Sequence, residues 1–197
     1  MPHQPSRREL ICDAALTLAA GGGNHAVTHS AIDTELGIAK GSTSYYFRTR
    51  AALVGAAITY LTDSSRAAFG ELLPNVPATI TLDSAADLIA AYLDELLTTR
   101  RRDLLARYAF ASDAASDCHL GDQLARCLFA PDAAAALMAR LGADDAAARS
   151  RDLLSLLEGL LFDFTYGSRG RTENADRKTA LHGAVRRWLI ALIQQST

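Results

Sequence analysis

The sequence predicts an all-α protein with two domains and about nine helices. Alanine and leucine dominate, aromatic residues make up only 7% of the chain, and β-branched residues rarely cluster. That balance favours helices over sheet. Apolar residues also recur at helical spacing along most of the 197 residues. Three short helical segments with tight turns come first, and a longer fourth leads into about five more.

The N-terminal segments carry clear start and stop signals. Ser6 and Glu9 form a capping box before the first helix, which the glycines at 21–23 should end. Thr28 can cap a second, short helix. Gly37 interrupts that helix, a third is expected over residues 39–47, and a fourth over about 49–73.

The rest of the chain predicts longer amphipathic helices over residues 84–99, 102–115, 121–141, 145–166 and 176–195. Pro131 should kink or split the third of these, because proline lacks an amide donor. The composition shifts at Pro74. We therefore expect an N-terminal domain over 1–53, a linking fourth helix over about 49–73, and a C-terminal domain over 74–197.

Charge is distributed unevenly. The formal net charge is −2, yet residues 36–62 hold three basic side chains and no acid. A confined cluster of Lys40, Arg48 and Arg50 is what a small anion-binding face would need. A solvated face with three charges is the alternative.

Several classes of protein are disfavoured. The most apolar run, residues 153–164, holds two acids and is far shorter than a membrane span. Charged residues from Arg7 to Asp13 interrupt any signal peptide, so we expect a cytoplasmic protein without a membrane partner. The three cysteines are odd in number and fall within helical patterns, which disfavours a disulfide framework.

Residues 28–47 have the layout of a helix-turn-helix, whose second helix enters the DNA major groove. Gly37 would supply the turn conformation that a side chain resists. Gly41, near the start of the second helix, would let the backbone approach a phosphate. Many corners between two helices share this spacing, so the layout alone is weak evidence for DNA binding.

The stretch "AIDTELGIAKGSTSYYFRTRAAL" is more specific. It resembles the DNA-binding signature of the TetR (tetracycline repressor) family, with its Gly-apolar-small-Lys-Gly segment, its aromatic pair before Phe47 and its basic residue before Ala-Leu. The resemblance covers about the first 60 residues. It implies a DNA-binding head followed by a helical domain for ligand binding and dimerisation.

The resemblance also implies roles for individual residues. Thr28 and Ser30 match phosphate-anchoring hydroxyls, although simple capping is the alternative. Thr43 could place its methyl against a thymine methyl. The DNA-contacting residues implied are Thr28, Ser30, Lys40, Gly41, Ser42, Thr43, Tyr45, Tyr46 and Arg50.

Three residues depart from the family pattern. Ser44 stands where tyrosine is usual, which shortens or removes one phosphate contact. Ala39 replaces a common N-capping serine. Asp33 replaces an alanine between the two helices, where it either tilts outward to pair with a cation or changes the packing.

The C-terminal domain is expected to dimerise through its last two helices. Their apolar stripes could instead bury against each other within one chain. The dimerisation residues expected are Leu153, Leu157, Leu160, Leu161, Phe164, Val185, Trp188, Leu189 and Leu192. Effector contacts are expected from aromatic and polar side chains of the middle helices, for which a core role is the alternative: Tyr92, Tyr108, Phe110, His119, Phe129 and Phe162.

The sequence favours no catalytic or metal chemistry. Asp144 and Asp145 lack the third acid of a helical terpenoid synthase, because Ala148 occupies its place. Cys118, His119 and Cys127 lack paired ligand spacing. We expect no enzyme activity, no metal and no cofactor.

The expected function is a dimeric transcriptional regulator, a repressor that a small-molecule effector releases from a palindromic operator in double-stranded DNA. An activator would carry the same motif. The rival class is a helical ligand-binding protein or enzyme with no DNA role.

Overall fold

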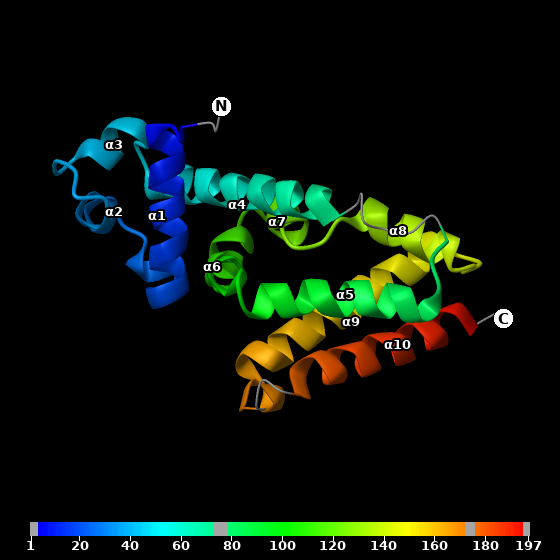
Figure 1. Cartoon of the computed structure of the whole chain (residues 1–197). Coiled ribbons are helices and arrows are strands. Elements are labelled where there is room, and N and C mark those ends of the chain that lie inside the picture. Colours follow the sequence, from blue (N-terminus) through cyan, green and yellow to red (C-terminus); the bar gives the residue numbers. More distant parts are fainter. Residues whose placement is uncertain (1–3, 73–78, 172–175, 195–197) are drawn as a thin grey trace. The chain divides into compact units, whose positions relative to one another are not determined.

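The computed structural model describes residues 4–72, 79–171 and 176–194 (Figure 1). Within these ranges the chain forms ten α-helices and two short 3₁₀ helices, and it contains no strand. The predicted all-α class is confirmed. The chain divides into two compact units, Met1–Glu71 with Arg102–Leu128, and Leu72–Arg101 with Phe129–Thr197. This grouping differs from the single domain boundary that the sequence indicates near residue 74, because residues 102–128 belong with the N-terminal helices.

The first unit holds seven helices. In chain order these are α1 (Arg7–Gly22), η1 (Asn24–Ala26), α2 (His29–Glu35), α3 (Ser42–Tyr46), α4 (Arg50–Leu72), nearly all of α6 (Arg101–Ala114) and α7 (Cys118–Ala125). Helix α1 begins with the predicted capping box. Ser6 accepts a hydrogen bond from the Glu9 amide at 3.3 Å, and the Glu9 carboxylate accepts one from the Ser6 amide at 2.6 Å.

The core of this unit is apolar. Helix α1 contributes Ile11 and Leu16, α2 contributes Ile32, and α6 contributes Phe110; all four are buried. Helix α4 buries one face at helical spacing, from Leu53 to Leu61. This shared core holds the short helices α2 and α3 against longer ones.

The second unit contains α5 (Leu82–Leu97), α8 (Pro131–Arg140), α9 (Ala146–Tyr166), η3 (Ser168–Arg171) and α10 (Arg177–Gln194). Helices α5, α9 and α10 pack side by side, and α8 packs on α9 (Figure 1). Two ion pairs join α10 to α5: Arg186 lies 2.5 Å from Asp83, and Arg177 lies 2.6 Å from Asp94.

Pro131 splits the helix expected over 121–141. It occupies the first turn of α8, where a proline loses no hydrogen bond. The preceding helix, α7, starts earlier than expected, at Cys118. The reason is Asp117, whose carboxylate accepts hydrogen bonds from the amides of His119 and Leu120.

Across the described ranges, no helix combines the length and the apolar character that a membrane crossing requires.

Candidate nucleic-acid interface

The turn between α2 and α3 depends on two glycines. Gly37 has φ 60° and Gly41 has φ 91°, both in the left-handed region that side chains disfavour. The turn role predicted for Gly37 is therefore confirmed. Gly41 ends the turn immediately before α3, so the helix starts at Ser42 rather than at residue 39.

Asp33 caps α3 from across the turn. Its carboxylate accepts hydrogen bonds from the amides of Gly41 at 2.6 Å and Thr43 at 2.9 Å. Asp33 is only 4% exposed, so it points inward rather than tilting outward toward a cation. The negative charge also suits the positive end of a helix. Asp33 thus supplies the cap that Ala39 cannot.

The same contacts control the titration of Asp33. Burial alone would raise its pKa, because a charged carboxylate is poorly solvated in the interior. Hydrogen bonds from Thr43 and Gly41 favour the charged form more strongly and hold the pKa below its usual range. The buried carboxylate is therefore ionised at neutral pH.

The other end of α3 is held by two side chains that the sequence analysis did not single out. His29 places Nε2 2.7 Å from the Phe47 carbonyl oxygen; a carbonyl only accepts, so Nε2 carries the proton. Arg8 donates to the Tyr46 carbonyl at 3.3 Å, and its guanidinium lies 4.4 Å from the centre of the Phe47 ring. These contacts satisfy carbonyls that a helix end leaves unpaired. No local sequence signal predicts them.

Most residues implied to contact DNA lie at the surface. The exposed ones are Thr28, Ser30, Lys40, Gly41 and Tyr45, and the half-buried ones are Ser42, Tyr46 and Arg50. Tyr45 is 79% exposed, and its ring meets that of Tyr46 edge to face at 5.3 Å. Thr28 also caps α2, accepting from the Ala31 amide at 3.1 Å. Their contacts with DNA stay a prediction.

Thr43 does not fit the base-contacting role. Its side chain is fully buried, and its hydroxyl lies beside the Asp33 carboxylate. In this conformation the Thr43 methyl cannot reach a thymine. The residue instead helps to seat α3 on the core.

Arg50 is already paired within the first unit, and its expected contact with a DNA phosphate stays a prediction. Its guanidinium pairs with Asp113 of α6 at 2.5 Å and donates to the Asn24 carbonyl at 2.8 Å. Burial would raise the pKa of Asp113, but hydrogen bonds from Arg50 and Asn24 outweigh it and lower the pKa. The charge of Arg50 is thus neutralised within the unit. Arg48 is exposed two residues earlier and is the better placed cation.

The expected effector residues fall into both units. Tyr108, Phe110 and His119 belong to the first unit, whereas Tyr92, Phe129 and Phe162 belong to the second. Phe110 is fully buried, and its side chain is part of the core, as the alternative reading held. Tyr92 and Phe129 are also buried, with ring centres 6.1 Å apart. Effector contact by these residues stays a prediction.

The apolar stripes assigned to dimerisation are already buried within the single chain. Helices α5, α9 and α10 cover them, which is the alternative that the stripes left open. Only Trp188 is half-buried; the buried members are Leu153, Leu157, Leu160, Leu161, Phe164, Val185, Leu189 and Leu192. The exposed face of α9 instead carries Phe162, 54% exposed, and Tyr166, 57% exposed.

No cluster of three or more histidine, cysteine or acidic side chains suited to a metal ion occurs in the described part of the chain. The three cysteines are free thiols.

Comparison with protein families decides the assignment. Residues 11–57 match bacterial regulatory proteins of the tetR family, and residues 81–191 match the tetracyclin repressor-like C-terminal domain. The chain belongs to the TetR family. Members are transcription regulators rather than enzymes, and the matched N-terminal residues include the DNA-binding helix-turn-helix.

Solved structures agree with the TetR fold. A transcriptional regulator from Rhodococcus sp. Rha1 has a TM-score of 0.76 and 22% identity, covering 96% of this chain and 97% of its own. A TetR-family member from Streptomyces coelicolor A3 has a TM-score of 0.70 and 22% identity, covering 96% and 99%. The multidrug binding protein EbrR, complexed with ethidium, has a TM-score of 0.67 and 22% identity, covering 95% and 99%. Comparison with curated proteins gave no significant match.

The Asp33 cap makes a testable contribution to stability. Replacing Asp33 by Asn leaves at least one of the two amides without its acceptor, which should cost about 1–3 kcal/mol near neutral pH. The folded pKa lies below the unfolded value of about 3.9. The ionised Asp33 carboxylate therefore stabilises the fold fully above about pH 5, and this stabilisation is lost as the pH falls through the folded pKa.

Thermal melting of both proteins from pH 3 to pH 7 measures this effect. The gap between wild type and Asp33→Asn should be widest near pH 7 and should close toward pH 3. Asp63→Asn, which alters an exposed carboxylate of α4, serves as the control. A gap that stays constant with pH, or widens in acid, would contradict the cap.

Proposed function

We propose that this TetR-family regulator binds a specific double-stranded DNA site with α3 in the major groove. The observation that supports DNA binding most directly is that side chains from other helices hold both ends of α3. Asp33 holds its start, and Arg8 and His29 hold its end, while Lys40 and Tyr45 remain open to solvent. A five-residue helix needs such support, because short helices are unstable alone.

The charge around α3 suits DNA. Lys40 and Arg48 are exposed and stand at either side of the helix in sequence, where they can neutralise backbone phosphates. Tyr45 and Ser44 lie exposed between them and can reach base edges or phosphates. Phosphate contacts would set the position of the helix, and the exposed hydroxyls would contribute to the choice of sequence.

We further propose a homodimer formed through the exposed face of α9. Phe162 and Tyr166 contact each other, with ring centres 5.3 Å apart, and both are more than half exposed. Gly159, one turn earlier, has open space where a side chain would project, so a partner helix can approach closely. Two-fold symmetry would place two α3 helices about 34–36 Å apart, one turn of the duplex.

A small-molecule effector would act by changing the separation of the two heads. Helix α6 is joined to the N-terminal helices by Arg50, Asp113 and Asn24, so a shift in α6 would carry the start of α4 with it. The ligand and the operator would then each weaken binding of the other by the same factor. This is the behaviour of a repressor in the cytoplasm, where bacterial DNA resides.

Selection of duplexes from a random pool, followed by fluorescence anisotropy, tests DNA binding directly. The purified chain should enrich a two-fold symmetric site and bind it in a salt-dependent manner. Enrichment of no site would refute the regulator and favour a helical ligand-binding protein instead.

Lys40→Ala should weaken binding to every duplex, because Lys40 is assigned to the phosphate backbone. The slope of log affinity against log salt should fall in magnitude by about one. Arg66→Ala, which removes an exposed cation from α4, is the matched control and should leave the slope unchanged. Loss of preference at a single base with an unchanged slope would contradict the phosphate role.

Phe162→Glu should weaken the dimer about thirtyfold or more, because it places a charge in an apolar contact. Sedimentation equilibrium measures the change. Leu10→Glu alters an exposed apolar residue of α1 and serves as the control. Dimers of equal strength in wild type and Phe162→Glu would place the interface on another face.

A further inference from the structure

Two adjoining cavities in the second unit are lined by arginines. One, of about 320 Å³, lies among the C-terminal end of α5, the end of α9 and the start of α10. The other, of about 330 Å³, lies against α10. They share Phe164 and Arg169, so together they form one site, here called the arginine site. Its cationic lining residues are Arg101, Arg169, Arg177 and Arg187.

The arginine site has more positive charge than its acids neutralise. Arg169 lies 3.3 Å from Asp163, and Arg177 lies 2.6 Å from Asp94. The other two lining arginines make no ion pair with the part of the chain that the structure describes. Among the described residues, Arg101 and Arg187 are therefore left without an acid, and these exposed cations can attract an anion to the cavities.

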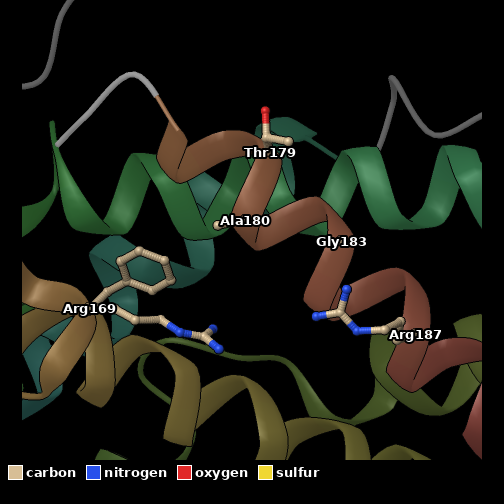
Figure 2. A pocket seen from close by; sticks show the side chains of 6 residues that line it. Arg169, Thr179, Ala180, Gly183 and Arg187 are labelled. Atoms are coloured by element: carbon tan, nitrogen blue, oxygen red, sulfur yellow. The ribbon is translucent and has the colours of Figure 1, made fainter. Parts of the chain in front are cut away.

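Two of the lining arginines, Arg169 and Arg187, face a common space. Figure 2 shows the guanidinium groups of Arg169 and Arg187 pointing toward each other from opposite sides of the cavity. The guanidinium of Arg187 lies beside Gly183 of the same helix, since a side-chain carbon at Gly183 would come into ordinary contact, 3.4 Å, with Nη1 of Arg187. Guanidinium forks of this kind hold carboxylates through two parallel hydrogen bonds.

The remaining lining is apolar. Phe164 and Leu97 are each 6% exposed and form a wall of the site. The Arg169 guanidinium lies 5.8 Å from the centre of the Phe164 ring, which fixes the cation over an aromatic face. A ligand with an apolar body would cover the small part of this wall that stays exposed, which a bare inorganic ion would not.

We propose that the arginine site binds a small organic anion, an aromatic carboxylate whose acid groups face the arginines and whose ring packs on Phe164. The volume of each cavity is at the lower end of the range for small-ligand sites. The site shares no residue with those expected from the sequence to contact an effector. Binding of the anion at this site does not depend on whether the chain binds DNA.

Isothermal titration calorimetry of the full-length chain with phthalate, at constant ionic strength, tests the proposal. Phthalate carries two carboxylates on one ring. It should bind saturably, with one site per chain, and its neutral diester dimethyl phthalate should not bind. Inorganic phosphate should bind more weakly, because it cannot cover Phe164.

Variants locate the binding. Arg101→Gln and Arg169→Gln should each weaken phthalate about tenfold or more, since each removes a charge-assisted hydrogen bond. Arg66→Gln removes an equal charge outside the site and should bind as wild type does. Arg101 is exposed and holds no ion pair within the described chain, so its variant tests the site even if Arg169→Gln unfolds.

Three results would overturn the proposal. Absence of saturable phthalate binding would show that the arginine site does not bind an aromatic carboxylate. Unchanged affinity in Arg101→Gln and in a folded Arg169→Gln would place the anion elsewhere. Phosphate binding as tight as phthalate binding would show that the apolar wall takes no part.

Discussion

The hydrogen bonds from the amides of Gly41 and Thr43 to the Asp33 carboxylate are the constraint on which the DNA-binding head depends. Helix α3 has five residues, too few to be stable in isolation. Its direction is therefore set by what holds its ends. A buried carboxylate at the start and Arg8 with His29 at the end leave the helix one orientation relative to α1 and α2. That orientation determines which side chains can meet a groove and which, like Thr43, are buried.

Local signals in the sequence predicted the elements well. Examples are the capping box at Ser6, the turn at Gly37 and the helix break at Pro131. Each of these depends only on residues close to it in the sequence, so the sequence alone indicates it. The resemblance over the first 60 residues likewise identified the head. The inward position of Asp33 was not predictable in this way, because the amides that donate hydrogen bonds to it lie eight and ten residues away across a turn.

Long-range pairing limited what the sequence could say about the candidate sites. In the sequence, Arg50 looks like an unpaired cation next to α3. In the structure, Asp113, 63 residues later, forms an ion pair with it. The wide apolar stripes of α9 and α10 read equally well as an interface between chains or as packing within one. Only their burial against α5 distinguishes the two. The arginine site was also not predictable from the sequence, because its arginines come from several helices and Arg177 pairs with Asp94, 83 residues earlier.

We propose that two α3 helices of a dimer read successive major grooves of one duplex. Methylation interference on a selected operator tests it most directly, because methylation at guanine N7 blocks the major groove. Interference should fall in two symmetric clusters whose centres are about 10–10.5 base pairs, or a multiple of that spacing, apart. A single cluster, or interference confined to the minor groove at adenine N3, would contradict the account.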